Sequence, residues 1–420
     1  MSENWYKLDN VAKVFLANHD NRNTQSLRVS FTMDQDIEPA LLQQALETTV
    51  ISLPQFQVRL RRGFFWHYLE ASAVTPMVTP EEGRPCPVLY GGSRKNYLHY
   101  RVSYYEKRIN IDIFHAIADG TGAFQFIELL TLNYLKLMYP GEYDDVSLPS
   151  NSSAADRSQN SFAHFYDNSN GPLPKTILNK KSKAFHILSR KLPYDQLQFF
   201  EIHLEADKIR LASKQIGVGL SAYLGAKLML AIKDDMPFMQ RKKPVTISMP
   251  VNLRNYYPSE TSRNFFNNVD VSHIFNGNET LEELAKEFDV KLKESLTPER
   301  INDQMNRYQS IERLFFTRMV PLAIKQPIVK AFSKKEKRRV TAVLSNLGVI
   351  KLPNEMTAHI TEVSDFCSTN SIFITATTYG NDFVLGITSA YQETGVIRRF
   401  VKSLEETGTS VKAYVSEVIN

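Results

Sequence analysis

Hydrophobic and polar residues alternate with a period of two in several segments of the first half of the chain. Such alternation is typical of half-buried strands. The segments are Ser26–Met33, residues 56–60, residues 64–69, residues 98–105 and Arg108–Phe114. Glu106 and Lys107 separate the last two segments as a hairpin turn would. A helical period begins at Pro39, and a stronger one covers residues 124–138 and ends at Pro140.

The second half repeats this mixture of periods. Strand patterns cover residues 201–205, 245–251, 340–344, 371–379 and 383–389. Gly380-Asn381 separates the last two, and such a pair favours a tight turn. Helical patterns cover residues 206–215, 221–233 and 281–296, two segments around Pro321, and a final segment from Gly395. Because strands and helices alternate in both halves, we predict an α/β or α+β fold with two similar-sized lobes.

The boundary between the lobes is predicted from a change in composition. Residues 146–183 contain a stretch rich in Ser and Asn and then a short basic run, a composition typical of linkers. We therefore expect an N-terminal lobe over residues 1–175 and a C-terminal lobe over residues 184–420.

Charge and cysteine content narrow the possible functions. The net charge is +5, which is too small to indicate nucleic-acid binding but is compatible with an anionic ligand. The basic run at residues 334–339 has three interpretations, namely a solvated helix end, a site for CoA phosphates, or an anionic membrane contact. Cys86 and Cys367 form no metal-binding or disulfide pattern, so we expect no metal.

Neither a signal peptide nor a membrane span is predicted. The first ten residues lack a basic start and an apolar core, and no uncharged apolar run reaches the ~18 residues that a span requires. We therefore expect a cytoplasmic protein.

One six-residue motif carries candidate chemistry. His115-Ala116-Ile117-Ala118-Asp119-Gly120 follows a predicted strand and precedes a predicted helix. A histidine can remove a proton from a hydroxyl or amine near neutral pH. Asp119 would anchor the loop by pairing with an arginine, and Gly120 would allow a turn that a side chain would obstruct. The motif therefore predicts proton transfer by His115.

Together with a second segment, this motif resembles the CoA-dependent acyltransferase superfamily. The second segment is Met249-Pro250-Val251-Asn252-Leu253-Arg254, followed by Asn264-Phe265. The superfamily includes chloramphenicol acetyltransferase and the condensation domains of peptide synthetases. The chain is most similar to stand-alone bacterial alcohol acetyltransferase-like proteins.

The resemblance implies two chloramphenicol-acetyltransferase-like lobes in a V, with a tunnel between them and His115 as general base. Asp119 would be structural and would form a salt bridge with Arg254 across the lobes. Ser345 and Asn346, in the similar segment Ser345-Asn346-Leu347-Gly348, would donate to an oxyanion or line the tunnel, or form a plain turn. The donor would be a free acyl-CoA co-substrate, acetyl or short acyl, with no bound cofactor. The acceptor would be a small-molecule or lipid alcohol.

Two alternatives remain open. Condensation domains usually carry two adjacent histidines, but Phe114 precedes His115 here, which favours free CoA over a carrier protein as donor. A carrier-protein-dependent enzyme that forms an ester or amide is one alternative. The other is a non-catalytic descendant that binds a ligand or scaffolds partners.

Overall fold

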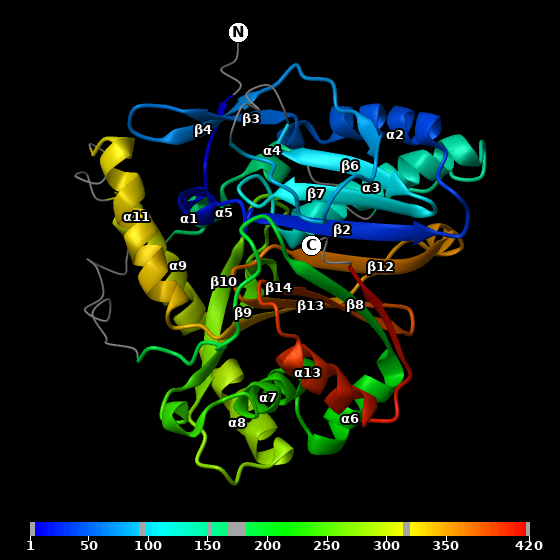
Figure 1. The fold of residues 1–420 in the computed structure, drawn as a ribbon. Helices are drawn as coiled ribbons and strands as arrows, with labels where there is room; N and C mark the ends of the chain where they lie inside the picture. The colour runs from blue at the N-terminus through cyan, green and yellow to red at the C-terminus, as the bar shows by residue number, and fades with distance from the viewer. Residues whose placement is uncertain (1–4, 92–97, 149–152, 167–181, 314–319, 417–420) are drawn as a thin grey trace.

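The protein folds into two lobes, each built on its own sheet (Figure 1). The computed structural model describes residues 5–91, 98–148, 153–166, 182–313 and 320–416. Strands and helices alternate through both lobes, as the sequence predicted.

The N-terminal lobe contains a five-stranded sheet in the order β12-β2-β7-β6-β5. Its strands are β2 (Ser26–Met33), β5 (Val78–Pro80), β6 (Tyr100–Tyr105), β7 (Arg108–Phe114) and β12 (Ile360–Cys367). Helices α2 (Pro39–Ser52) and α3 (Gly120–Met138) pack on each other, and α3 packs on β2 and β7. A smaller sheet joins β1 (Trp5–Lys7), β4 (His67–Ala71) and β3 (Val58–Arg62) beside helix α1 (Asn10–Asn18).

The C-terminal lobe contains a seven-stranded sheet in the order β10-β9-β11-β13-β14-β8-β15. Its strands are β8 (Gln198–Glu205), β9 (Val245–Asn252), β10 (Phe266–His273), β11 (Ala342–Val349), β13 (Ile372–Tyr379), β14 (Asp382–Ser389) and β15 (Val411–Val415). The helices of this lobe are α6 (Ala206–Ile216), α7 (Leu220–Lys233), α8 (Leu281–Ser295) and α13 (Gly395–Glu405). Two further helices, α9 (Pro298–Arg313) and α11 (Leu322–Lys337), lie along one edge of the molecule (Figure 1).

Strand β12 links the two lobes, because it comes from the C-terminal half of the chain but completes the N-terminal sheet. It pairs antiparallel with β2, from Ile360 opposite Met33 to Cys367 opposite Leu27. Ile360 and Val363 are buried in the hydrophobic core of the N-terminal lobe. Polar residues within this strand interrupt the alternation of hydrophobic and polar positions, so no strand was predicted there.

The structure corrects three local predictions. Helix α3 begins at Gly120 rather than at residue 124, because the Asp119 side chain caps it. Residues 345–348 belong to strand β11, so the plain turn considered for them is wrong. The linker-like segment contains two short helices, α4 (Ala154–Ser158) and α5 (Ser161–His164).

Among the described helices, none is both long and apolar enough to cross a membrane alone; α6 and α7 meet that criterion only as a pair bent by 86°.

Candidate active site

His115 lies at the carboxyl end of β7, where the chain turns into α3. The His115 backbone N–H donates to the Gln25 carbonyl at 2.7 Å, which continues the pairing with β2 by one residue. The Ile117 N–H donates to the Phe114 carbonyl at 2.9 Å and closes a tight turn. Two backbone hydrogen bonds therefore fix the position of His115, whose side chain is half-buried.

Asp119 and Arg254, which the sequence analysis paired, are in contact. Arg254 Nη1 lies 2.8 Å from Asp119 Oδ2, and Nη2 lies 3.2 Å from Oδ1. The same carboxylate accepts from the Gly122 N–H at 3.1 Å and from the Phe265 N–H at 3.0 Å. Arg254 also donates to the Thr261 carbonyl. With all of these partners, the Asp119 carboxylate joins the start of α3 to the C-terminal lobe.

The position that requires a glycine is Gly122, two residues after the motif, rather than Gly120 within it. Gly120 has no left-handed backbone conformation, and a Cβ there would lie 3.4 Å from Leu347 Cδ2, a tolerable contact. A Cβ on Gly122 would lie 2.0 Å from the Ser262 carbonyl oxygen. The turn expected of Gly120 is therefore not what this position provides, whereas Gly122 permits the close approach of α3 to the 262 segment.

Asn264 binds the His115 ring, a contact that the sequence analysis did not assign. Asn264 Oδ1 lies 2.9 Å from His115 Nδ1. Asn264 Nδ2 donates to the His115 carbonyl at 2.8 Å and to the Asp9 carboxylate at 3.3 Å. Both of those partners are pure acceptors, so Nδ2 must face them and Oδ1 must face the ring. His115 Nδ1 is therefore the protonated nitrogen, and the lone pair resides on Nε2.

Two aromatic rings flank the histidine. The Phe15 ring, on α1, lies 4.3 Å from the His115 ring, and the Phe266 ring, at the start of β10, lies 5.7 Å away. Burial lowers the pKa of His115, and the nearby Asp119 carboxylate and the Asn264 hydrogen bond offset only part of this effect. The imidazole is therefore neutral at neutral pH, as a general base must be.

Ser345 and Asn346 lie on β11, and the structure does not bring Asn346 to the histidine. Asn346 Nδ2 donates to Ser221 Oγ at 2.9 Å, and its Oδ1 accepts from the Gly348 N–H at 2.9 Å. The residue of this strand that reaches the motif is Leu347, beside Gly120. Ser345 pairs in register with Thr375 of β13, and no contact between Ser345 and His115 is seen among the described residues.

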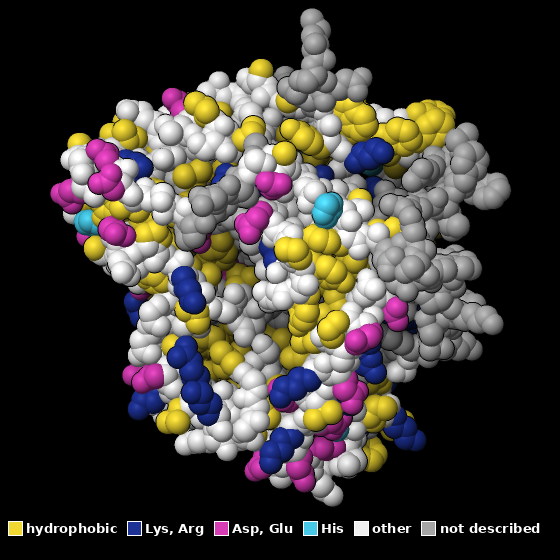
Figure 2. Space-filling model, turned by 180° about the vertical axis from the view of Figure 1, so that it is seen from behind, with side chains coloured by type: hydrophobic (Ala, Val, Ile, Leu, Met, Phe, Trp, Pro, Cys, Tyr) yellow, Lys and Arg dark blue, Asp and Glu magenta, His cyan; other side chains and the backbone are white. Residues whose placement is uncertain are grey.

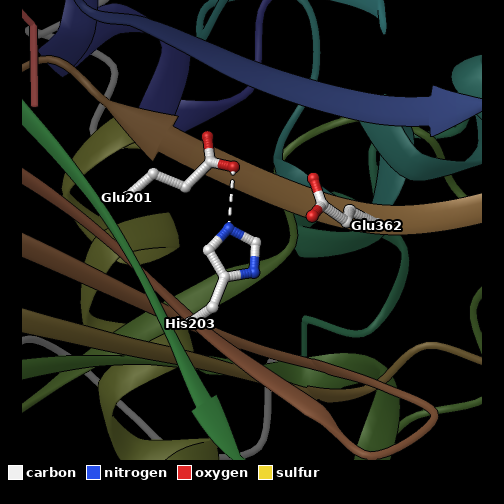
Figure 3. Close-up of side chains that lie close together, drawn as sticks. All are labelled: Glu201, His203 and Glu362. Carbon is white, nitrogen blue, oxygen red and sulfur yellow. Dashed lines mark hydrogen bonds and ion pairs between the residues drawn. The ribbon is translucent and has the colours of Figure 1, made fainter. Parts of the chain in front are cut away.

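A second cluster of titratable groups joins the lobes away from His115. Glu201, His203 and Glu362 lie close together (Figure 3). Arg108 donates to both Glu201 carboxylate oxygens at 2.8 Å. His203 Nδ1 lies 2.8 Å from Asp382 Oδ2 and Nε2 lies 3.1 Å from Glu201 Oε1.

This arrangement suits an ion-pair network rather than a metal centre. Burial alone would lower the pKa of His203, but hydrogen bonds to Asp382 and Glu201 outweigh it and raise the pKa to about 9. Both ring nitrogens then carry protons, so His203 offers no lone pair to a metal. Burial would raise the pKa of Glu201, but His203 and Arg108 bring it down to about 2. No sequence motif pointed to this network, because its members come from β7, β8, β12 and β14.

Seen from behind, the molecule is hollowed between its upper and lower halves, and hydrophobic side chains line the hollow (Figure 2). The Asp119–Arg254 ion pair and the Asn264–His115 hydrogen bond each join the two halves of the chain, so the histidine lies where the lobes meet.

Comparison with known proteins places the fold. No protein-family model and no curated protein sequence matches the chain. The trichothecene 15-O-acetyltransferase of Fusarium sporotrichioides is 10% identical, with a TM-score of 0.61, over 96% of this chain and 94% of that one. The polyketide synthase associated protein 5 of Mycobacterium tuberculosis is 13% identical, with a TM-score of 0.61, over 95% and 96%.

A variant of the starter condensation domain of rhizomide synthetase, solved with C8-CoA and Leu-SNAC, is 10% identical, with a TM-score of 0.65, over 96% of this chain and 94% of that one. The chain therefore has the fold shared by condensation domains and an O-acetyltransferase, as the two motifs implied. At such low identities the likeness establishes the fold, and the chemistry must be argued from the site.

Proposed function

We propose that the protein is an acyltransferase that moves an acyl group, acetyl or short acyl, from a CoA thioester to an alcohol. The observation that carries this proposal is the hydrogen bond from His115 Nδ1 to Asn264, which leaves the Nε2 lone pair to act as general base. A neutral imidazole in a fixed tautomer is the group that such a transfer requires.

The reaction needs a single proton carrier. Nε2 removes the proton of the acceptor hydroxyl while its oxygen attacks the thioester carbonyl carbon. The tetrahedral intermediate then collapses, the C–S bond breaks, and the imidazolium returns its proton to the departing thiolate. The products are an ester and CoA thiol, and no covalent bond to the protein forms. The Phe15 and Phe266 rings beside His115 favour an apolar acyl chain or acceptor.

Asp119 and Arg254 serve as support in this mechanism. Both oxygens of the Asp119 carboxylate already accept hydrogen bonds from Arg254 and from the backbone N–H groups of Gly122 and Phe265. Asp119 therefore does not relay protons to His115. The proposed role of this pair is to hold the β7–α3 turn against the C-terminal lobe.

The test is release of CoA thiol from a panel of acyl-CoA thioesters with a panel of alcohols. The protein is expected to release thiol only when donor and alcohol are both present, and His115→Ala is expected to lose this activity while its circular dichroism is unchanged. A His115→Ala variant with unimpaired turnover would exclude His115 as the base. Turnover by neither free thioesters nor carrier-bound ones would favour a non-catalytic binding protein.

A carrier-dependent condensation is the second candidate, because condensation domains are among the structures of the same fold. The same assay distinguishes it. Product formation from an acyl-phosphopantetheinyl carrier, with no turnover of the same acyl group on free CoA, would assign the donor to a carrier protein.

A further inference from the structure

Helix α11 presents an apolar stripe to solvent. Ile324, Ile328 and Phe332 are 56%, 61% and 55% exposed. They are spaced four residues apart, so they lie on one face of the helix. Helices at a protein surface normally bury their apolar face against the core. On α11 the buried residues are instead Leu322 and Ser333, so this stripe has no covering layer within the described part of the chain.

The turn between β3 and β4 extends this stripe. Phe64 is 71% exposed and Trp66 is 47% exposed. The Leu322 N–H donates to the Phe64 carbonyl at 2.9 Å, and Lys325 Nζ donates to the Phe65 carbonyl at 3.0 Å. The hairpin tip therefore rests on the first turn of α11, at the left edge of Figure 1. We call the exposed apolar residues of these two elements the apolar edge, namely Phe64, Trp66, Ile324, Ile328 and Phe332.

Basic residues are concentrated on the same helix as the apolar stripe, with Lys335 on the side of Phe332 and Lys330 and Lys334 farther around the helix. Residues 322–339 contain seven Lys or Arg and one Glu, a net charge of +6, although the whole chain carries only +5. The one acid, Glu336, is already paired with Arg339 at 2.7 Å. Lys330, Lys334 and Lys335 are exposed, and no carboxylate partner is seen for them in the part of the chain that the structure describes. The positive charge is therefore not neutralised locally.

We propose that the apolar edge and its lysines dock the protein on an anionic lipid bilayer. Exposed aromatic and aliphatic side chains enter the boundary between headgroups and acyl chains, and neighbouring lysines attract anionic headgroups. CoA phosphates alone would use the lysines but would leave the exposed apolar stripe unexplained. An acidic protein surface is the rival partner. The projecting hairpin tip and the length of the helix, about 24 Å for 16 residues, suit a laterally extended lipid surface better than a compact globular one.

The proposal is tested by co-sedimentation of the full chain with vesicles of phosphatidylcholine alone and of phosphatidylcholine with phosphatidylglycerol. Binding is expected to the anionic vesicles and to weaken strongly when salt is raised from about 0.1 M to about 1 M, because salt screens exposed charges. Equal binding to both vesicle types, or binding to neither, overturns the proposal. Vesicle binding is read without substrate, so its failure is distinct from failure of the proposed acyl transfer.

Two pairs of matched variants locate the surface. K330Q/K334Q/K335Q is expected to lower the vesicle partition coefficient on the order of 100-fold. The control K208Q/K214Q/K402Q removes the same charge from exposed positions on α6 and α13 and is expected to bind as the unmodified protein does. I328S/F332S is expected to weaken binding at least tenfold, whereas I51S/M77S, at apolar residues that are 81% and 63% exposed and so more exposed than Ile328 and Phe332, is expected not to. Equal losses in a variant and its control would overturn the assignment to α11.

Discussion

The side-chain amide of Asn264 lies between the His115 ring and the Asp9 carboxylate, with Oδ1 2.9 Å from His115 Nδ1 and Nδ2 3.3 Å from Asp9 Oδ2. Asp9 is buried and also caps helix α1 through the Ala12 N–H. The directions of the hydrogen bonds in the series Asp9–Asn264–His115 follow from Asp9, because a carboxylate can only accept. Asp9 thus determines the orientation of Asn264, and Asn264 determines which nitrogen of His115 holds the proton.

Replacement of Asn264 tests this relationship. Asn264→Ala is expected to lower kcat roughly 10- to 100-fold, less than the ~10²–10⁴-fold contribution of a general base itself, because the base remains but its tautomer is no longer selected. KM is expected to change little. Asn268→Ala, at an exposed position of β10, the strand that begins two residues after Asn264, provides the control. If Asn264→Ala kept the wild-type kcat and pH profile, Asn264 would be a packing residue only.

The Asp119–Arg254 ion pair predicts a loss of stability. The two side chains are 6% and 10% exposed, so Asp119→Ala would leave a buried guanidinium without its partner. Removal of one partner of a buried pair costs about 3–5 kcal/mol. Asp119→Ala is therefore expected to lower the free energy of unfolding by about this amount in urea titrations, whereas Asp36→Ala, at an exposed acid, is expected to lower it by less than about 0.5 kcal/mol.

A double variant distinguishes the effect on stability of an unpaired buried charge from the effect of a lost side-chain contact at this site. In Asp119→Ala/Arg254→Met no charge remains buried, so part of the lost stability is expected to return. A single variant as stable as the unmodified protein, or a double variant that loses the sum of both single effects, would show that the pair does not hold the β7–α3 turn.

Those parts of the fold and site that depend on local pattern were predictable from the sequence. The β6–β7 hairpin, helix α3 and the His115 motif each lie in one continuous segment whose period or spacing is visible. Asn264 was visible only as part of a motif match, since its role depends on a contact across 149 residues. Likewise, β12 contains the polar residues Ser364 and Asp365, which are buried because they form hydrogen bonds with residues of other strands. Such long-range hydrogen bonds produce no periodic pattern of hydrophobic residues in the sequence, so the strand could not be predicted.

The His203 network predicts a stability that depends on pH. Burial lowers the pKa of His203, but Asp382 and Glu201 outweigh this effect and raise the pKa from 6.5 to about 9. A raised pKa in the folded state stabilises the protein below about pH 6.5, and this contribution is lost as pH rises through about 9. The side chain is 7% exposed, so the loss is on the order of 3 kcal/mol.

The melting temperature is accordingly expected to fall between pH 7 and pH 10 by more in the unmodified protein than in His203→Gln. The variant should already be less stable at pH 7, because Asp382 and Glu201 lose their imidazolium partner. Parallel melting curves for the two proteins across this range would show that the imidazolium adds nothing to stability.

The pKa of His115 predicts the pH dependence of turnover. Burial lowers this pKa below 6.5, so the ring is neutral and competent as a base at pH 7. We expect kcat/KM to rise with pH through an apparent pKa below 6.5 and then to stay level up to about pH 8. The Asn264 hydrogen bond raises the pKa of His115. Its loss in Asn264→Ala is therefore expected to move this acidic limb to still lower pH. An acidic limb centred above 6.5, or one that Asn264→Ala leaves in place, would mean that a group other than this histidine controls the rate, because the Asn264 hydrogen bond contributes to the pKa of His115.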